Sequence, residues 1–155
     1  MTLARTDKRM NDQIHRVYVD TIEGTTCMMP CPARATSPDT YELLSDDNFE
    51  FDEDYMLFEY GPGDTVTAKE EVDQDGTNIL TARDLVRSGG TKNDLKRLLY
   101  RVCATKPDIA IIFRDFTKNQ LRDLLDYVES AGFIYPEIRE WVTTNASALE
   151  QHLQQ

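Results

Sequence analysis

Length, composition and charge limit what this chain can be. Its 155 residues match one ordinary domain, 40% of them are apolar, and the formal net charge is −11, so we expect a folded, acidic protein. No window reaches the roughly 18 apolar residues of a membrane span, and the first residues lack the apolar run of a signal peptide. Three cysteines do not form the even set of a disulfide framework. These features predict a cytoplasmic protein with reduced thiols.

The acidity is concentrated in one block. Between Glu42 and Asp75 there are thirteen Asp or Glu and a single Lys, a local balance of −12. A direct nucleic-acid partner is disfavoured, because binding phosphates requires a basic stripe. The block either attracts a partner with a basic surface or serves as solvated, solubilising surface.

The first part of the chain predicts one strand and a long loop. Residues 1–12 are polar and without periodicity, which indicates a flexible tail. Residues 13–22 alternate apolar and polar side chains, as a half-buried strand does. The prolines of CMMPCPARATSPDT then favour a loop over residues 27–40, and Ser37-Pro38 can begin a short helix over TYELL.

Turn residues next predict a three-stranded antiparallel meander. YMLFEY and TVTAKEEV contain many strand formers and are separated by Gly-Pro-Gly-Asp, a type II turn signal. Asp-Gln-Asp-Gly marks the next reversal before Asn78-Ile79-Leu80. ARDLVRS is expected as a short helix that ends at Gly89-Gly90.

A repeated phrase follows the acidic block. TKNDLKRLLYRV (91–102) and TKNQLRDLLDYV (117–128) share Thr-Lys-Asn, three leucines and a final valine. Both predict amphipathic helices with a threonine N-cap, because the leucines recur at helical spacing. IAIIF (109–113) is expected as a buried central strand, and FIYPEIREWV as a strand bent at its proline.

The stretch from LKRLLYRV to the AGF turn resembles the small α/β domain of ExbD/TolR-type transport proteins, in which a helix, a strand preceded by Pro-Asp and a second helix follow in that order. The resemblance implies the βαβαβ order. It implies no energy-coupling function, because no N-terminal membrane anchor is expected here.

The sequence therefore predicts an α+β fold whose C-terminal half is α/β-like. An antiparallel meander is followed by a βαβαβ unit, and two amphipathic helices pack on a mixed sheet. Residues 13–145 are expected to form a single domain, and residues 146–155 a polar C-terminal tail.

Cys27 and Cys31 are the candidate metal ligands. Their spacing allows both to bind one ion, with His15, Cys103 or His152 completing the set. Structural zinc sites usually have a second tight pair of ligands, which this chain lacks. We therefore expect ordinary thiols, with no metal and no cofactor.

The candidate partner-binding face combines acids with aromatic side chains. Acidic groups would steer the encounter with a basic protein, and buried aromatic groups would supply affinity. Its residues are Asp46, Asp47, Phe49, Glu50, Phe51, Asp52, Glu53, Asp54 and Tyr55.

An alternative site lies at Arg114, Asp115 and Asn119. If IAIIF is a strand, these residues occupy a strand-to-helix turn, where open α/β sheets bind ligands. Arg114 and Asp115 can equally form a surface ion pair. The sequence favours a non-enzymatic protein–protein interaction module (an adaptor, an inhibitor or a nucleic-acid mimic). The alternative is a small enzyme or ligand-binding protein that uses this turn.

Overall fold

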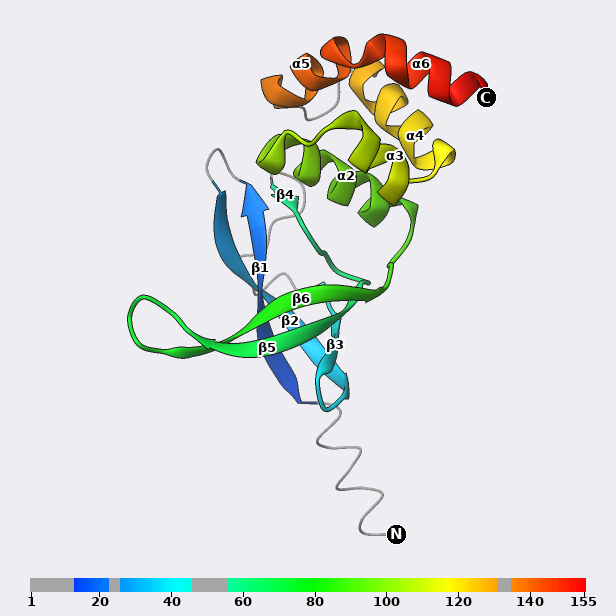
Figure 1. Ribbon diagram of the computed structural model, residues 1–155. Helices are drawn as coiled ribbons and strands as arrows, with labels where there is room; N and C mark the ends of the chain where they lie inside the picture. Colours follow the sequence, from blue (N-terminus) through cyan, green and yellow to red (C-terminus); the bar gives the residue numbers. More distant parts are fainter. Residues whose placement is uncertain (1–12, 23–25, 46–55, 131–134) are drawn as a thin grey trace, which may run out of the picture.

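The computed structural model describes residues 13–22, 26–45, 56–130 and 135–155. Within these ranges the N-terminal part forms strands and the C-terminal part forms helices (Figure 1). The strands are β1 (Ile14–Ile22), β2 (Thr26–Ser37), β3 (Thr40–Leu43), β4 (Leu57–Phe58), β5 (Thr65–Val72) and β6 (Asn78–Arg87). The helices are α2 (Thr91–Thr105), α3 (Ile109–Asp115), α4 (Lys118–Glu129), α5 (Pro136–Thr144) and α6 (Ala146–Gln154).

The sheet is a closed barrel, so the predicted meander is wrong. Its order is β2-β3-β5-β6-β1, and pairing of β1 with β2 closes the circle. Neighbours along the circle are antiparallel except β1 and β6, which pair in parallel. β4 does not lead the predicted hairpin, because it pairs with the end of β1 instead. The coarser expectation, an α+β protein with a mixed sheet, is confirmed.

Turn chemistry predicted two reversals correctly. In Gly-Pro-Gly-Asp, Gly63 has a φ of 97°, the positive value that the third position of a type II turn requires. In Asp-Gln-Asp-Gly, Gly76 has a φ of 81°, and this turn joins β5 to β6. The β5–β6 hairpin extends beyond the body of the barrel (Figure 1).

The proline-rich segment is strand β2 and not a loop. The carbonyl of Pro32 accepts from the amide of Leu44 at 2.7 Å, so this residue directs its polar backbone groups away from β1. Pro30 lies two positions earlier and has the same orientation along the strand. The nitrogens of Pro30 and Pro32 therefore face away from β1, so the β1–β2 pairing requires no hydrogen bond from them. A strand tolerates proline at such positions.

Two short helices expected in the first half are also strands. The Ser37–Leu44 region is the β2–β3 hairpin, with Ser37 paired to Thr40. ARDLVRS belongs to β6, which pairs with β5 as far as Arg87. In both places the partner strand supplies hydrogen bonds that local sequence signals do not reveal.

The C-terminal half is entirely helical in the described residues, so the βαβαβ order is wrong. Ile109–Asp115 is helix α3, and the Asp108 carboxylate caps it by accepting from the amide of Ala110 at 2.9 Å. Pro136 occupies the start of α5, a position that suits proline. Residues 146–155, expected as a polar tail, contain α6, whose Leu149 is buried. The predicted flexible tail, residues 1–12, lies outside the described residues.

Both copies of the repeated phrase form the predicted helices. Thr117 caps α4 in a full capping box with Gln120. At α2 the N-cap is Gly90, not the predicted Thr91, and no side chain caps it. Leu98, Leu99 and Leu124 of the predicted leucine stripes are buried, whereas Leu125 and Ile111, the latter in the expected buried strand 109–113, are only partly buried.

The buried residues form two clusters. One fills the barrel and includes Val17, Cys31 and Phe58. The other lies among the helices and also takes in Ile22 of β1 and Leu57 of β4. The ends of β1 and β4 thus carry the helical layer, and α2 lies against them (Figure 1).

Candidate functional site

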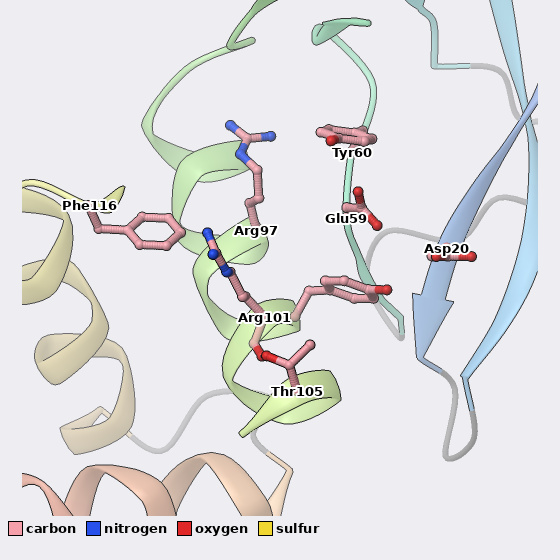
Figure 2. Close-up of a pocket in the computed structure, with 8 residues that line it drawn as sticks. Asp20, Glu59, Tyr60, Arg97, Arg101, Thr105 and Phe116 are labelled. Carbon is pink, nitrogen blue, oxygen red and sulfur yellow. The ribbon is translucent and has the colours of Figure 1, made fainter. Parts of the chain in front are cut away.

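A cleft of about 420 Å³ lies where the barrel meets α2. β1 contributes Asp20 to its wall, and the segment that follows β4 contributes Glu59 and Tyr60 (Figure 2). The opposite wall consists of α2 residues and of one side chain that follows α3: Arg97, Tyr100, Arg101, Thr105 and Phe116.

Two carboxylates face each other in this cleft because of the β1–β4 register. Thr21 pairs with Phe58, so Asp20 and Glu59 are opposite one another in the next pair. The Glu59 amide donates to the Asp20 carbonyl at 2.9 Å. Like charges directly across an antiparallel pair destabilise a sheet. The arrangement therefore needs a compensating contact.

Tyrosine side chains provide part of that compensation. The Tyr100 hydroxyl lies close enough to Asp20 and Glu59 for both carboxylates to act on it. Burial raises the pKa of Tyr100, and the two carboxylate charges raise it further, so its hydroxyl keeps its proton. The Tyr60 hydroxyl donates to the Arg83 carbonyl at 3.0 Å, which ties the cleft wall to β6.

The Glu59 carboxyl is the perturbed acid of the cleft. Burial raises its pKa, and the charge of Asp20 adds to this effect. Hydrogen bonding with Tyr60 and Tyr100 and the charge of Arg101 act in the opposite direction, without cancelling the rise. The charged form of Glu59 is therefore under-stabilised in the protein as it stands.

The two arginines of the cleft are paired with other carboxylates. Arg97 contacts Asp64 at 2.8 Å and Asp94 at 2.6 Å. Arg101 contacts Asp115 at 2.6 Å, and its guanidinium lies 5.9 Å from the centre of the Phe116 ring. The lining itself therefore has two carboxylates and two arginines, and the partners of these arginines add three carboxylates around it.

The Asp64 carboxylate holds α2 against the barrel. Asp64 is fully buried and accepts from the Gly61 amide at 3.0 Å and the Gly89 amide at 2.6 Å. It also accepts from the Asn93 amide at 3.0 Å and from Arg97. Every oxygen lone pair therefore has a partner from the turn, the β6–α2 connection or α2 itself.

Close backbone contact accompanies this network. A Cβ atom on Gly89 would lie 2.6 Å from the carbonyl carbon of Gly63 and 2.9 Å from the Asp64 nitrogen. Only glycine allows the β6–α2 connection to approach the turn so closely. The geometry of the cleft thus depends on a turn that the sequence predicted correctly.

Replacing Glu59 by Gln should stabilise the protein in a pH-dependent way. The raised pKa means that the folded chain binds this proton more tightly than the unfolded chain does, whose carboxyl titrates near 4.5. Ionisation of Glu59 therefore costs stability as the pH rises above that value, and the full cost applies above the raised pKa. We expect Glu59→Gln to unfold a few degrees higher than the parent at pH 7, with the difference shrinking toward pH 4.5 and vanishing below it.

Thermal unfolding at closely spaced pH values measures this effect. Glu129→Gln, an exposed change on α4, is the control and should leave the profile unchanged. A Glu59→Gln variant that is less stable than the parent by the same amount at every pH would contradict the assignment.

The predicted partner-binding residues, Asp46 to Tyr55, lie outside the described residues. The flanking positions are described: Ser45 follows β3, and Met56 precedes β4. Met56 leads through β4 directly to Glu59 and the cleft. The acidic segment is therefore connected in sequence to the acidic wall of the cleft.

The alternative ligand site has a different setting from the one predicted. Arg114 and Asp115 end helix α3, so they are not at a strand-to-helix turn. The Arg114 Nε atom donates to Asp115 at 2.9 Å, and the Asn119 side chain accepts from Arg122 at 3.1 Å. Asp115 reaches the cleft only indirectly, as the partner of Arg101. A ligand role for these residues stays a prediction.

The candidate metal ligands lie in β2. Cys31 is buried in the barrel and donates to backbone carbonyls, and Cys27 contacts the Thr21 hydroxyl. His15 packs against Tyr41, and His152 stacks on Phe113. Across the described residues no three His, Cys, Asp or Glu side chains are grouped to hold a metal ion.

Sequence reasoning did not find the cleft. Glu59 belongs to the acidic block, but Asp20 was interpreted only as the polar face of a strand, and Tyr100 only as a helix residue. Finding the cleft requires knowing that β1 pairs with β4, and these two segments are far apart in the chain. Nothing local in either segment indicates it.

Comparisons with known proteins give no relative. No protein-family model matches the chain, and neither the curated proteins nor the solved structures yield a significant match. None of the helices in the described ranges has both the length and the apolar character that crossing a membrane requires.

Proposed function

We propose that this protein is a non-enzymatic protein–protein interaction module that binds a partner with a basic surface. The observation that carries the proposal is the charge of the cleft region. Five carboxylates, Asp20, Glu59, Asp64, Asp94 and Asp115, surround the two cleft arginines and Arg114, which shares Asp115, so this region has an excess of two negative charges. Such an excess attracts cationic groups and repels phosphates.

The acidic segment 46–55 extends this charge in the sequence. It is followed in the sequence by Met56, a few residues before Glu59. Asp52, Glu53 and Asp54 would steer the encounter, and Phe51 would act as an apolar anchor. The segment and the cleft are proposed to form one docking face.

The histidines support a binding role over a catalytic one. His15 and His152 are engaged with aromatic rings, and neither lines the cleft. The cleft tyrosines are held in their protonated form, because burial raises the pKa of Tyr60 as well as that of Tyr100. These groups are donors suited to fixing a ligand and not to taking up a proton.

Binding of synthetic peptides tests the proposal. Peptides of equal length with strongly positive, zero and strongly negative net charge are titrated at low and high salt. We expect the parent to bind the positive peptide alone, with an affinity that falls as salt rises. Asp52→Lys, Glu53→Lys and Asp54→Lys together should slow association at least about tenfold, because charges at the rim of an interface act on encounter.

Two further variants separate a docking face from general charge. Asp123→Lys, Asp126→Lys and Glu129→Lys on α4 change the net charge equally at exposed positions and should have a much smaller effect. Phe51→Ala should accelerate dissociation about thirtyfold, which corresponds to an anchor of about 2 kcal/mol. Equal losses in the two triple variants, with no effect of Phe51→Ala, would show that the acidic block is solubilising surface.

A further inference from the structure

We infer that the cleft between β1, the β4 end and α2 is a pocket for one guanidinium group, contributed by an arginine side chain of the basic partner. This inference rests on the proposed function and narrows it to a residue type. It assigns the ligand contacts to Asp20, Glu59 and Tyr100, with Tyr60 and Phe116 as aromatic walls. Arg97 and Arg101 also line the cleft, where Arg97 is paired with Asp64 and Asp94 and Arg101 with Asp115.

The size of the cleft suits a single side chain. Its volume of about 420 Å³ is at the lower end of the roughly 300–1,000 Å³ that small-ligand sites occupy. A helix, about 10–12 Å across with its side chains, does not enter such a space. One long side chain from a docked surface does.

The carboxylate pair suits a planar, multiply donating cation. Asp20 comes from β1 and Glu59 from the segment that follows β4, so a ligand must offer donors in more than one direction. A guanidinium carries five N–H donors in a rigid fork, whereas the lysine ammonium is a compact and strongly hydrated charge. The fork can engage both carboxylates, and charge-assisted bonds of this kind are the strong ones.

The aromatic walls favour the same ligand. A guanidinium stacks on aromatic faces more readily than an ammonium does, because it is weakly hydrated and planar. The chain already shows this packing beside the cleft, where Arg101 lies over the Phe116 ring while it also pairs with Asp115. A ligand arginine packed on an aromatic wall of the cleft beside Glu59 would combine the same two contacts, an aromatic face and a carboxylate.

The energetics of the Asp20–Glu59 carboxylate pair supply a driving force for cation binding. Two carboxylates opposite one another oppose folding, and Glu59 is the acid whose ionisation the protein resists. A bound cation removes both penalties. A divalent metal ion would relieve the charge as well, but calcium and magnesium require about six or more oxygen ligands, which makes the metal an outcome to test.

Small model compounds test the pocket without a partner. We would titrate the ¹⁵N-labelled protein with the N-acetyl methylamides of arginine, lysine and citrulline, and with calcium chloride alone, and follow backbone amide shifts by NMR. Citrulline keeps the shape of arginine and lacks its charge. We expect saturable shifts at Asp20, Glu59 and Tyr100 with the arginine compound, at least about fivefold weaker binding of the lysine compound, and no saturation with citrulline.

The combined change Asp20→Asn and Glu59→Gln should weaken arginine binding at least about tenfold while the protein stays folded, which its amide spectrum and thermal unfolding verify. The control, Asp123→Asn with Asp126→Asn, removes equal charge from α4 and should leave arginine binding unchanged. Three results would each overturn the inference. The citrulline compound could bind with the same affinity as the arginine compound, calcium ions could produce the same saturable shifts, or the shifts with the arginine compound could fail to saturate.

The same titration separates the pocket from the wider proposal. In one outcome, the positive peptide still binds, its binding depends on Asp52, Glu53 and Asp54, and the Asp20→Asn, Glu59→Gln change has no effect on it. That result would support the docking face and refute the arginine pocket. If the arginine compound binds the cleft while no positive peptide binds, the result would support the arginine pocket and refute the interaction module.

Discussion

Replacing Asp64 by Ala is expected to lower the free energy of unfolding by about 3–5 kcal/mol, the usual loss when one partner of a buried ion pair is removed. The Asp64 side chain is fully buried and pairs with Arg97, whose side chain is 13% exposed. Without the carboxylate, the Arg97 charge and the amides of Gly61 and Gly89 lose their buried acceptor. Denaturant unfolding measures the loss.

A double-mutant cycle identifies its cause. Arg97→Met combined with Asp64→Ala removes both charges, so it should be less destabilising than the two single losses added together. Glu42→Ala breaks the surface pair with Arg34, whose side chain is 46% exposed, and should cost less than about 1 kcal/mol. If the free energy of unfolding of Asp64→Ala were no lower than that of Glu42→Ala, the buried network would not hold α2 to the barrel.

Replacing Leu98 by Ala is expected to cost about 2–5 kcal/mol, through lost apolar contact and the cavity left behind. Leu98 is fully buried in the helical cluster, where it lies among residues of several helices. Leu124 occupies the same position in the second copy of the repeated phrase and is also fully buried, so Leu124→Ala should cost a similar amount.

Leu85→Ala serves as the matched control for the helix face. Leu85 is 38% exposed on β6, and its truncation should change stability by about 0.5 kcal/mol or less. Chemical denaturation of the three variants ranks them. If Leu98→Ala unfolded at the same denaturant concentration as Leu85→Ala, the buried face of α2 would be assigned incorrectly.

Features set by a few neighbouring residues were predictable from the sequence. The turn at Gly63, the turn at Gly76 and the capping box of Thr117 each depend on side chains within one turn of the backbone. The two repeated helices were predictable because leucine spacing marks a buried stripe wherever the helix packs. The regularity is local in each case.

Features set by distant partners were not predictable. β2 was misassigned because proline signals dominate locally, while the β1 partner that tolerates those prolines is apparent only in the barrel. IAIIF was misassigned because a short apolar run fits a strand or a buried helix equally well, and the Asp108 cap decided the outcome. The cleft was missed for the same reason, because its carboxylates meet only through pairing of β1 with β4.

The short pairing of β1 with β6, which closes the barrel, has a consequence for the order of folding. Only Val17 with Leu80 and Tyr18 with Thr81 pair across it, and the segments are far apart in the chain. A contact of this kind forms late, because closing a long loop must precede any gain from the pairing. The helices make most of their contacts with segments that are nearer in the sequence, so they can assemble earlier. Until the join forms, β1 and β6 present open strand edges, which can pair with another chain. We therefore expect the newly made protein to be most exposed to strand exchange and aggregation in the interval before its barrel closes.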